Sequence, residues 1–239
     1  MINRVVTLGF FLTRNLFRSL LGVLPPALTL LAYRLTFTYR NQGDPDYFVA
    51  VGGIGLALVS VVTALLVADR ANRAAMYPMI ARLRHRGEYL AAMVFSIVLI
   101  SMAMAALYTG CVLVFQNMTL TPLQILLVAP RWLIVFIFGA TLGVNLTKLA
   151  NRGGSYLIVW GVLGAMVFLR ERAILFDVPA FLTDWVELVV RPITFTLTTT
   201  LEPFSLQVLP AWLITLAYAG AFYFLAVLLF HRKDLSWVE

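Results

Sequence analysis

Asp184 and Glu187 are the pair of side chains in this sequence whose type and spacing come closest to a catalytic or metal-binding set. Residues three apart share one face of a helix, and two adjacent carboxylates can perform general acid–base chemistry or hold a cation. No third ligand or partner base lies near them in the sequence, so the solvated face of an interfacial helix is the simpler interpretation. His85 and His231, the only histidines, lie far apart in the chain. We therefore predict no catalytic residue, no metal ligand and no bound cofactor.

Motifs that would support enzymatic or ion-coupled chemistry are missing from the sequence. There is no G-x-x-x-x-G-K-[ST] stretch to hold the phosphates of ATP and no H-E-x-x-H to hold zinc. No apolar stretch carries a central Asp, Glu or Lys of the kind that proton- or sodium-coupled carriers use. We therefore expect a protein that is not itself an enzyme. The secondary-transporter interpretation is weakened but stays open.

The elements that would position Asp184, Glu187 and the histidines are long apolar stretches. Stretches of this kind are typical of an all-α polytopic membrane protein. Residues 47–68, 89–115 and 208–230 contain no charged residue or histidine, and each is long enough for the roughly 17–25 residues of a membrane-crossing helix. Apolar residues make up 62% of the chain and charged residues 12%, a balance that a soluble domain does not need. The single cysteine, Cys111, rules out an intrachain disulfide. We predict one transmembrane domain over 1–239, with six spans at 20–38, 47–68, 89–115, 123–146, 155–169 and 208–230.

Prolines and glycines inside the predicted spans indicate where helices are disturbed or closely packed. Pro25 and Pro26 remove two backbone donors, so we expect a kink or a delayed helix start in the first span. Pro130-Arg131 interrupts the fourth span, and we expect its membrane-buried part to begin at Trp132. The spacing Gly139-x-x-x-Gly143 lets helices approach closely, which predicts a packing surface.

Basic residues are distributed unequally across the predicted spans, which indicates an orientation. The segment Asp69–Glu88, between the second and third spans, holds five arginines and His85, and short basic loops of this kind stay in the cytoplasm. With both termini inside, 12 of the 18 Lys and Arg residues lie on the inner side. Orientation and anionic lipid then explain the net charge of +7 better than nucleic acid does. We expect a multi-pass protein of the plasma (cytoplasmic) membrane with both termini in the cytoplasm.

The same basic segment has the pattern of a docking helix. Pro78 lies near the start of a predicted helix over 73–86. Its apolar face, at the 3–4 spacing of a helix, comprises Met76, Met79, Ile80 and Leu83. A charged helix with an apolar stripe can dock into a groove on a cytoplasmic protein. The alternative is that the arginines only set the topology and bind anionic lipid.

Residues 1–19 are predicted to form an amphipathic helix in the inner membrane interface. Apolar and polar positions alternate along it: Val5, Val6, Phe10, Leu12 and Phe17 against Arg4, Arg14, Asn15 and Arg18. The helix is either an anchor before the first span or an elbow against which a cytoplasmic partner works. The uninterrupted apolar core of a cleavable signal is missing, so we expect this helix in the mature protein.

The segment 170–207 is long for a loop and too apolar to lie free in water. We predict a helix over 179–190 and a second short element over 193–201, which together form an extracytoplasmic hairpin dipping into the outer leaflet. Such a hairpin would cap the exit of a path through the membrane. The residues of this predicted gate are Phe181, Trp185, Pro192, Phe195 and Pro203.

The whole arrangement resembles the permease subunit of an ABC transporter of the ABC-2 type. The shared features are the N-terminal amphipathic helix, six spans with both ends inside, the helical inner loop, the broken hairpin before the last span and the basic tail. Pro78, Arg82 and the run Glu88-Tyr89-Leu90 fit the inner-loop pattern of that family. The ending Phe230-His-Arg-Lys-Asp is also similar to the family's common close.

This resemblance implies that the chain forms the translocation path of an ATP-driven exporter and couples to a separate cytoplasmic ATPase. The implied partners are P-loop ATPase subunits, a second permease copy or paralogue, and membrane lipid. A non-catalytic structural or assembly subunit of a larger membrane complex, and a self-sufficient carrier or channel, stay open as alternatives. The residues implied in ATPase coupling are Met76, Tyr77, Pro78, Met79, Arg82, Arg84, Arg86 and Glu88.

Overall fold

The computed structural model describes residues 2–37, 45–71, 83, 85–116, 121–147 and 208–231. Within these ranges all regular structure is helical, as the sequence predicts. The elements are α1 (Ile2–Phe17), the 3-10 helix η1 (Leu20–Val23), α2 (Leu24–Phe37), α3 (Pro45–Ala71), α5 (Arg86–Phe115), α6 (Pro122–Asn145) and α9 (Val208–His231). The predicted fifth span, 155–169, and the predicted hairpin, 170–207, lie outside the described residues.

Five of the described helical segments are long and apolar enough to cross a membrane, which indicates a helical membrane protein. They correspond to the first, second, third, fourth and sixth predicted spans. The segments are Leu20–Phe37, Tyr47–Ala71, Gly87–Phe115, Val128–Asn145 and Trp212–Phe230.

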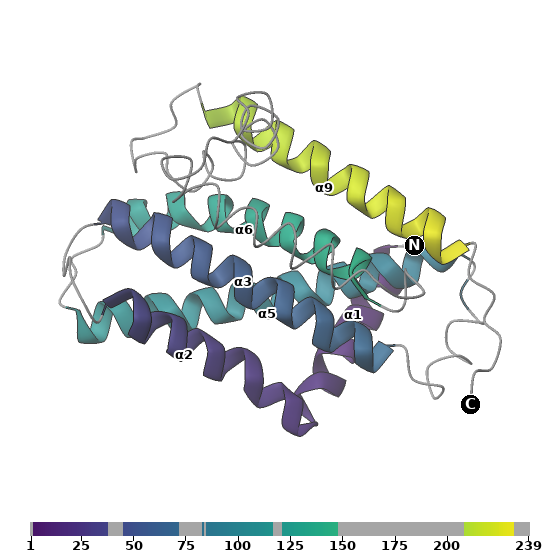
Figure 1. The fold of residues 1–239 in the computed structure, drawn as a ribbon, viewed down its shortest axis with the longest axis horizontal. Coiled ribbons are helices and arrows are strands. Elements are labelled where there is room, and N and C mark those ends of the chain that lie inside the picture. Colours follow the sequence, from purple (N-terminus) through teal and green to yellow (C-terminus); the bar gives the residue numbers. More distant parts are fainter. Residues whose placement is uncertain are drawn as a thin grey trace, which may run out of the picture.

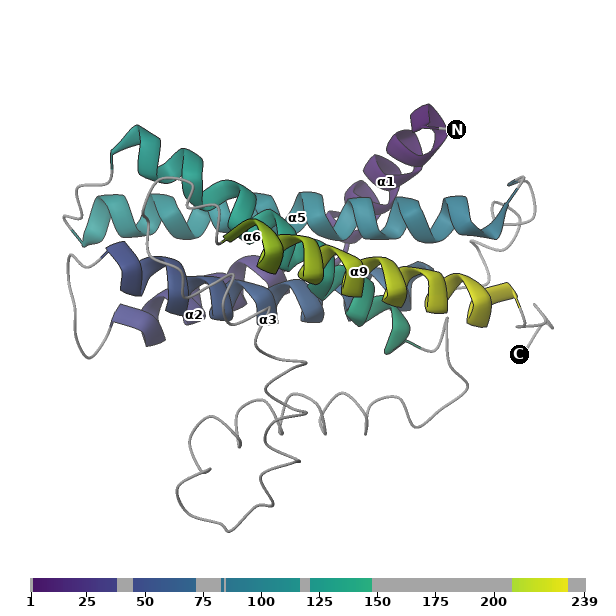
Figure 2. The ribbon, with the colours of Figure 1, turned by 90° about the horizontal axis from the view of Figure 1, so that it is seen from above.

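The long helices lie side by side in one bundle, with α6 in its interior and with α2 and α9 on opposite flanks (Figures 1 and 2). Within the crossing segments, 72% of α6 is buried, compared with 28% of the α2 segment and 22% of α9. Because α2 and α9 are apolar all round, their uncovered sides suit lipid better than water. They therefore form the outer sides of the described bundle.

The two ends of the bundle differ in composition. At the basic end α3 finishes, α5 begins and α9 finishes, and this end carries Arg70, His85 and Arg86. At the opposite, aromatic end α2 and α5 finish and α3 begins, near Phe37 and Phe48. Figure 2 shows α1 projecting at an angle from the spans in the half of the bundle that holds the basic end.

Gly139 and Gly143 bring α6 into close contact with α3. A Cβ on Gly143 would overlap the Cβ of Ala64, and one on Gly139 would lie 3.3 Å from Oγ of Ser60. The Gly-x-x-x-Gly spacing of α6 therefore meets Ser60-x-x-x-Ala64 on α3, so both helices place small residues at the crossing. The packing surface predicted from these glycines is confirmed, and it lies inside this chain.

The prolines of the first and fourth spans have different effects. Pro25 and Pro26 lie in the first turn of α2, where backbone N–H groups have no intrahelical partner, and η1 precedes them. The helix start is thus delayed, as expected. Pro130, however, lies inside a continuous α6, and the predicted interruption at Pro130-Arg131 is wrong. A proline is tolerated inside a membrane helix that neighbouring helices cover, and α3, α5 and α9 all pack on α6. Arg131, next to the proline, is buried, with 3% of its surface exposed.

Candidate functional site

The N-terminal helix α1 has three faces, and the first packs on α5. Its buried residues are Leu8, Gly9, Leu12 and Leu16. Gly9 permits the close approach, because a Cβ there would overlap the ring of Phe95 and would lie 3.1 Å from the carbonyl oxygen of Ala92. Phe10 adds an edge-on contact with Phe95, with 5.8 Å between ring centroids.

A pair of hydroxyls also joins α1 to α5. The hydroxyl of Thr13 donates to the carbonyl of Gly9 at 2.9 Å, and its oxygen lies 2.8 Å from Oγ of Ser96. Since Thr13 has a single hydroxyl proton, Ser96 is the donor in the second bond. Packing and hydrogen bonding together therefore attach α1 to the span that begins at the basic end.

The second face of α1 is apolar and exposed. Ile2, Phe10 and Phe17 have 78%, 53% and 46% of their surfaces exposed, and Val6 lies on the same side. Large apolar side chains on one side of an amphipathic helix enter the boundary between lipid headgroups and acyl chains. This face therefore suits the membrane interface, as the sequence predicts for residues 1–19.

The third face of α1 is basic and contains one aromatic ring. Its exposed residues follow the 3–4 spacing of a helix: Arg4, Thr7, Phe11, Arg14 and Arg18. No Asp or Glu precedes Asp44 in the sequence, so no acid of the same helix neutralises these arginines. Phe11 has 44% of its surface exposed in the middle of the charged residues. Exposed aromatic rings and arginines are the residues that protein–protein interfaces favour.

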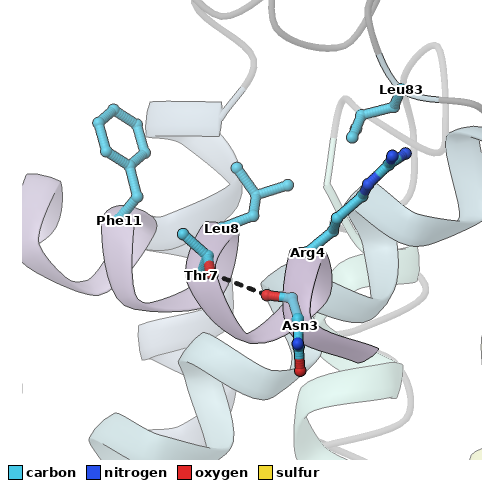
Figure 3. Close-up of a pocket in the computed structure, with 6 residues that line it drawn as sticks. All are labelled: Asn3, Arg4, Thr7, Leu8, Phe11 and Leu83. Carbon is cyan, nitrogen blue, oxygen red and sulfur yellow. Dashed lines mark hydrogen bonds between the residues drawn. The ribbon is translucent and has the colours of Figure 1, made fainter. Parts of the chain in front are cut away.

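An open groove of about 460 Å³ lies along this basic face. The residues that line it are Asn3, Arg4, Thr7, Leu8, Phe11 and Leu83. Figure 3 shows Leu8 and Phe11 on one side of α1, with Arg4 extending toward Leu83. Leu83 belongs to the predicted docking segment between the second and third spans. The groove therefore joins the two parts of the chain that the sequence assigns to a cytoplasmic partner.

Tyrosine hydroxyls connect the helices that meet at the basic end. Tyr89 of α5 donates to the carbonyl of Ala71, the last residue of α3, at 3.0 Å. Tyr223 of α9 donates to the carbonyl of Gly87, in the first turn of α5, also at 3.0 Å. These two bonds flank the predicted docking segment on both sides, because Ala71 precedes it and Gly87 follows Arg86. The positions of its two chain ends are thus tied to three helices.

Glu88, one of the predicted coupling residues, is covered by protein. It lies in the first turn of α5 with 4% of its surface exposed, and its backbone N–H donates to the carbonyl of His85 at 3.0 Å. Its Oε2 is buried and has no hydrogen-bond partner among the described residues. A role in ATPase coupling stays a prediction for this residue.

Aromatic rings from four helices interlock at the aromatic end. Tyr108 of α5 stacks on Phe48 of α3 with 5.9 Å between centroids, and meets Trp132 of α6 edge-on at 6.3 Å. Phe37 of α2 lies 6.4 Å from Tyr108. Gly52 makes room for the ring, since a Cβ there would lie 2.7 Å from Cε1 of Tyr108. This end is a dense internal contact rather than an open surface.

Most residues that the sequence assigns to a site cannot be placed. Arg86 begins α5 and Glu88 follows in its first turn. The other predicted coupling residues, Met76, Tyr77, Pro78, Met79, Arg82 and Arg84, lie outside the described residues. So do Asp184, Glu187 and the predicted gate residues Phe181, Trp185, Pro192, Phe195 and Pro203. Among the residues that the structure describes, no group of His, Cys, Asp and Glu could hold a metal ion.

Sequence reasoning missed Phe11 as part of a groove, and it missed the roles of Tyr89 and Tyr223. The tyrosines could have been found, because a tyrosine inside an apolar helix needs a hydrogen-bond partner for its hydroxyl. The partners themselves lie in other helices. Comparison of the chain with models of protein families, with curated proteins and with solved structures gives no match.

Proposed function

We propose that this chain is the membrane-spanning permease subunit of an ATP-driven exporter of the ABC-2 type. It forms the translocation path, and a separate cytoplasmic chain hydrolyses ATP. The observation that carries the proposal is the groove between the basic face of α1 and Leu83. Two segments far apart in the sequence, each with the pattern of a partner-binding helix, contribute to one concave surface outside the bundle of spans.

The groove has the chemistry of a docking site for a helix with mixed side chains. Leu8, Phe11 and Leu83 offer an apolar floor, and Arg4 lies at its edge without an ion pair among the described residues. An apolar side chain of the ATPase inserts against this floor, and an acidic residue beside it pairs with Arg4. Apolar anchors of this kind contribute most of the binding energy of an interface, while charge complementarity fixes the orientation of the partner.

Phe11 and Phe17 give a matched test of the docking site. Their exposed fractions are nearly equal, 44% and 46%, but they lie on the basic and the lipid-facing sides of α1. Phe11→Ala should weaken co-purification with the co-expressed P-loop ATPase at least tenfold, since truncating an interface anchor costs about 2 kcal/mol or more. Phe17→Ala should leave it unchanged. ATPase recruitment that survives Phe11→Ala, or that is lost equally in both variants, would overturn the docking site.

The proposal requires the basic end and both termini to lie in the cytoplasm. Cysteines introduced at Gln42 and Arg84, in a Cys111→Ser background, test this orientation. A membrane-impermeant thiol reagent should label position 42 in intact cells and should label position 84 only after the membrane is opened. The reverse pattern would place the groove on the outer side, where no ATPase could reach it.

A further inference from the structure

The first turn of α5 is the point at which the basic end is connected to the last helix. The hydroxyl of Tyr223 in α9 donates to the carbonyl of Gly87 at 3.0 Å. The ring of Tyr89 stacks on Phe230 of α9, with 6.5 Å between centroids and 20° between ring planes. We call this hydrogen bond and this ring contact, taken together, the tyrosine junction.

Tyr89 takes part in a second connection at the same place. Its hydroxyl donates to Ala71 at the end of α3 while its ring contacts α9. Tyr89 and Phe230 are both fully buried, with 0% and 1% of their surfaces exposed. One side chain therefore contacts the helix that enters the predicted docking segment and the last helix of the described bundle. A displacement of the segment cannot leave α9 unaffected while these contacts hold.

α9 is the helix best suited to respond to such a displacement. Only 22% of its crossing segment is buried, and a Cβ on Gly220 would meet no atom of the described residues within 4 Å. Its other contacts with the described residues lie on one side, where Phe222 packs edge-on against Phe138 of α6 at 5.8 Å between ring centroids. An element covered on one side moves with less repacking than one enclosed on all sides.

We infer that Tyr89 and Tyr223 are positioning residues that transmit the movement of the basic end to α9 during transport. This role rests on the proposed function, since the movement comes from the docked ATPase. The tyrosine junction stays closed through the cycle, so α9 and the start of α5 move together. Neither tyrosine touches the ATPase or the transported molecule.

Removal of one hydroxyl tests the role of the junction. Tyr223→Phe keeps the ring and loses the bond to Gly87, while Tyr218→Phe is the matched control, a half-buried tyrosine on the same helix. Tyr223→Phe should bind the ATPase as the natural protein does but should lower transport per ATP hydrolysed by about fivefold or more, the lower range of measured couplings between sites. Tyr218→Phe should change neither quantity. Normal coupling in Tyr223→Phe would overturn the inference.

A reversible cross-link separates transmission from mere stability. A Cβ on Gly87 would lie 3.9 Å from Cγ2 of Val227, a position that Sγ of a cysteine at residue 227 can take, so the two residues face each other across the junction. Gly87→Cys with Val227→Cys, in a Cys111→Ser background, should therefore form a disulfide that holds the junction closed. Oxidation should restore coupling to Tyr223→Phe, and reduction should remove it again. If the oxidised pair instead stops transport by the protein with Tyr223 intact, the junction must open during the cycle and the inference is wrong.

Amide exchange of the permease alone distinguishes a failure of this inference from a failure of the proposed function. Tyr223→Phe should increase exchange at residues 88–91, next to the lost bond, and Tyr218→Phe should not. Unchanged exchange in Tyr223→Phe would show that the hydroxyl bond does not hold the two helices together, whatever the function is. If the natural protein has no ATPase partner, the proposed function is rejected. The inferred transmission of movement to α9 is then rejected as well, even if the exchange data confirm the junction.

Discussion

The basic end and the aromatic end of the bundle combine ring contacts and hydrogen bonds in different proportions. At the aromatic end, Tyr108, Phe48 and Trp132 bring rings from three helices into contact, and Gly52 fits beneath one of them. At the basic end a single ring pair, Tyr89 with Phe230, lies beside two hydroxyls, those of Tyr89 and Tyr223, that reach carbonyls of neighbouring helices. Interlocked rings resist sliding, whereas a hydroxyl can follow its acceptor through a small rotation. The difference fits the proposed function, in which the aromatic end fixes the bundle and the basic end receives the ATPase.

The largest effect is expected from filling the space beneath Tyr108. Gly52→Leu would place its Cβ 2.7 to 3.0 Å from the ring and hydroxyl of Tyr108, a fully buried side chain that is packed against other rings. We expect a destabilisation of about 3 kcal/mol or more, at the upper range for overpacked cores. Thermal unfolding in detergent, followed by gel filtration, measures it.

Gly110→Leu is the control for this change. Gly110 lies on the same helix as Tyr108, and a Cβ there would meet no atom within 4 Å in the part of the chain that the structure describes. The Gly110→Leu variant should therefore fold normally. Its free energy of unfolding should rise by about 0.5–1 kcal/mol, because a glycine inside a helix is replaced. Equal stability of the two variants would show that the aromatic end is not the fixed part of the bundle.

Part of this comparison could be predicted from the sequence. Apolar length alone located five spans, because a bilayer requires about 20 apolar residues whatever surrounds them. The spacing of Gly139 and Gly143 also located a helix contact. The environment of Glu88 could not be derived in the same way, since neighbouring helices decide whether a charged residue at a span end is covered or exposed. The continuity of α6 through Pro130 likewise depends on the helices that pack around it.

The groove and the tyrosine junction depend on contacts between residues far apart in the chain. Leu83 lies in the groove beside residues of α1 that are more than 70 positions away in the sequence. Tyr223 contacts Gly87, more than 130 residues away. Periodicity identifies the face of a helix but not the element that covers it. For α1 it predicted an amphipathic helix, but the division of this helix into a face on α5, a lipid-facing side and an open groove required the structure.

An effect of intermediate size is expected at the basic end, where a substitution should abolish ATPase binding while the bundle stays folded. Gly9→Leu would overlap Phe95 and approach the carbonyl of Ala92, so α1 must move away from α5. This overlap should weaken the packing of α1 on α5 by about 1–3 kcal/mol. The spans pack on one another without α1, so their packing should not change. We expect near-normal thermal unfolding of the bundle together with a loss of ATPase co-purification, because the groove is formed in part by α1.

Val6→Leu serves as the control for Gly9→Leu, because it adds bulk on the side of α1 that faces lipid. It should leave both stability and ATPase recruitment unchanged. Recruitment that persists in Gly9→Leu, with α1 shown by amide exchange to be displaced, would remove α1 from the docking surface. Unfolding of the whole bundle by Gly9→Leu would show that the two ends do not differ in the way described.

The smallest effect concerns the hydroxyl pair that attaches α1 to α5. Thr13→Val keeps the shape of the side chain and removes both its bond to Gly9 and its acceptor for Ser96. Hydrogen bonds between helices in membrane proteins contribute about 0.6 kcal/mol on average, so α1 should loosen slightly without leaving its place. Thr13→Ser retains the hydroxyl and should behave as the natural protein does. A double-mutant cycle of Thr13→Val with Ser96→Ala, read by amide exchange of α1, should give a coupling of that size. A coupling of zero would mean that packing at Gly9 alone holds α1 on the bundle, which would make the contrast between a packed end and a hydrogen-bonded end less sharp.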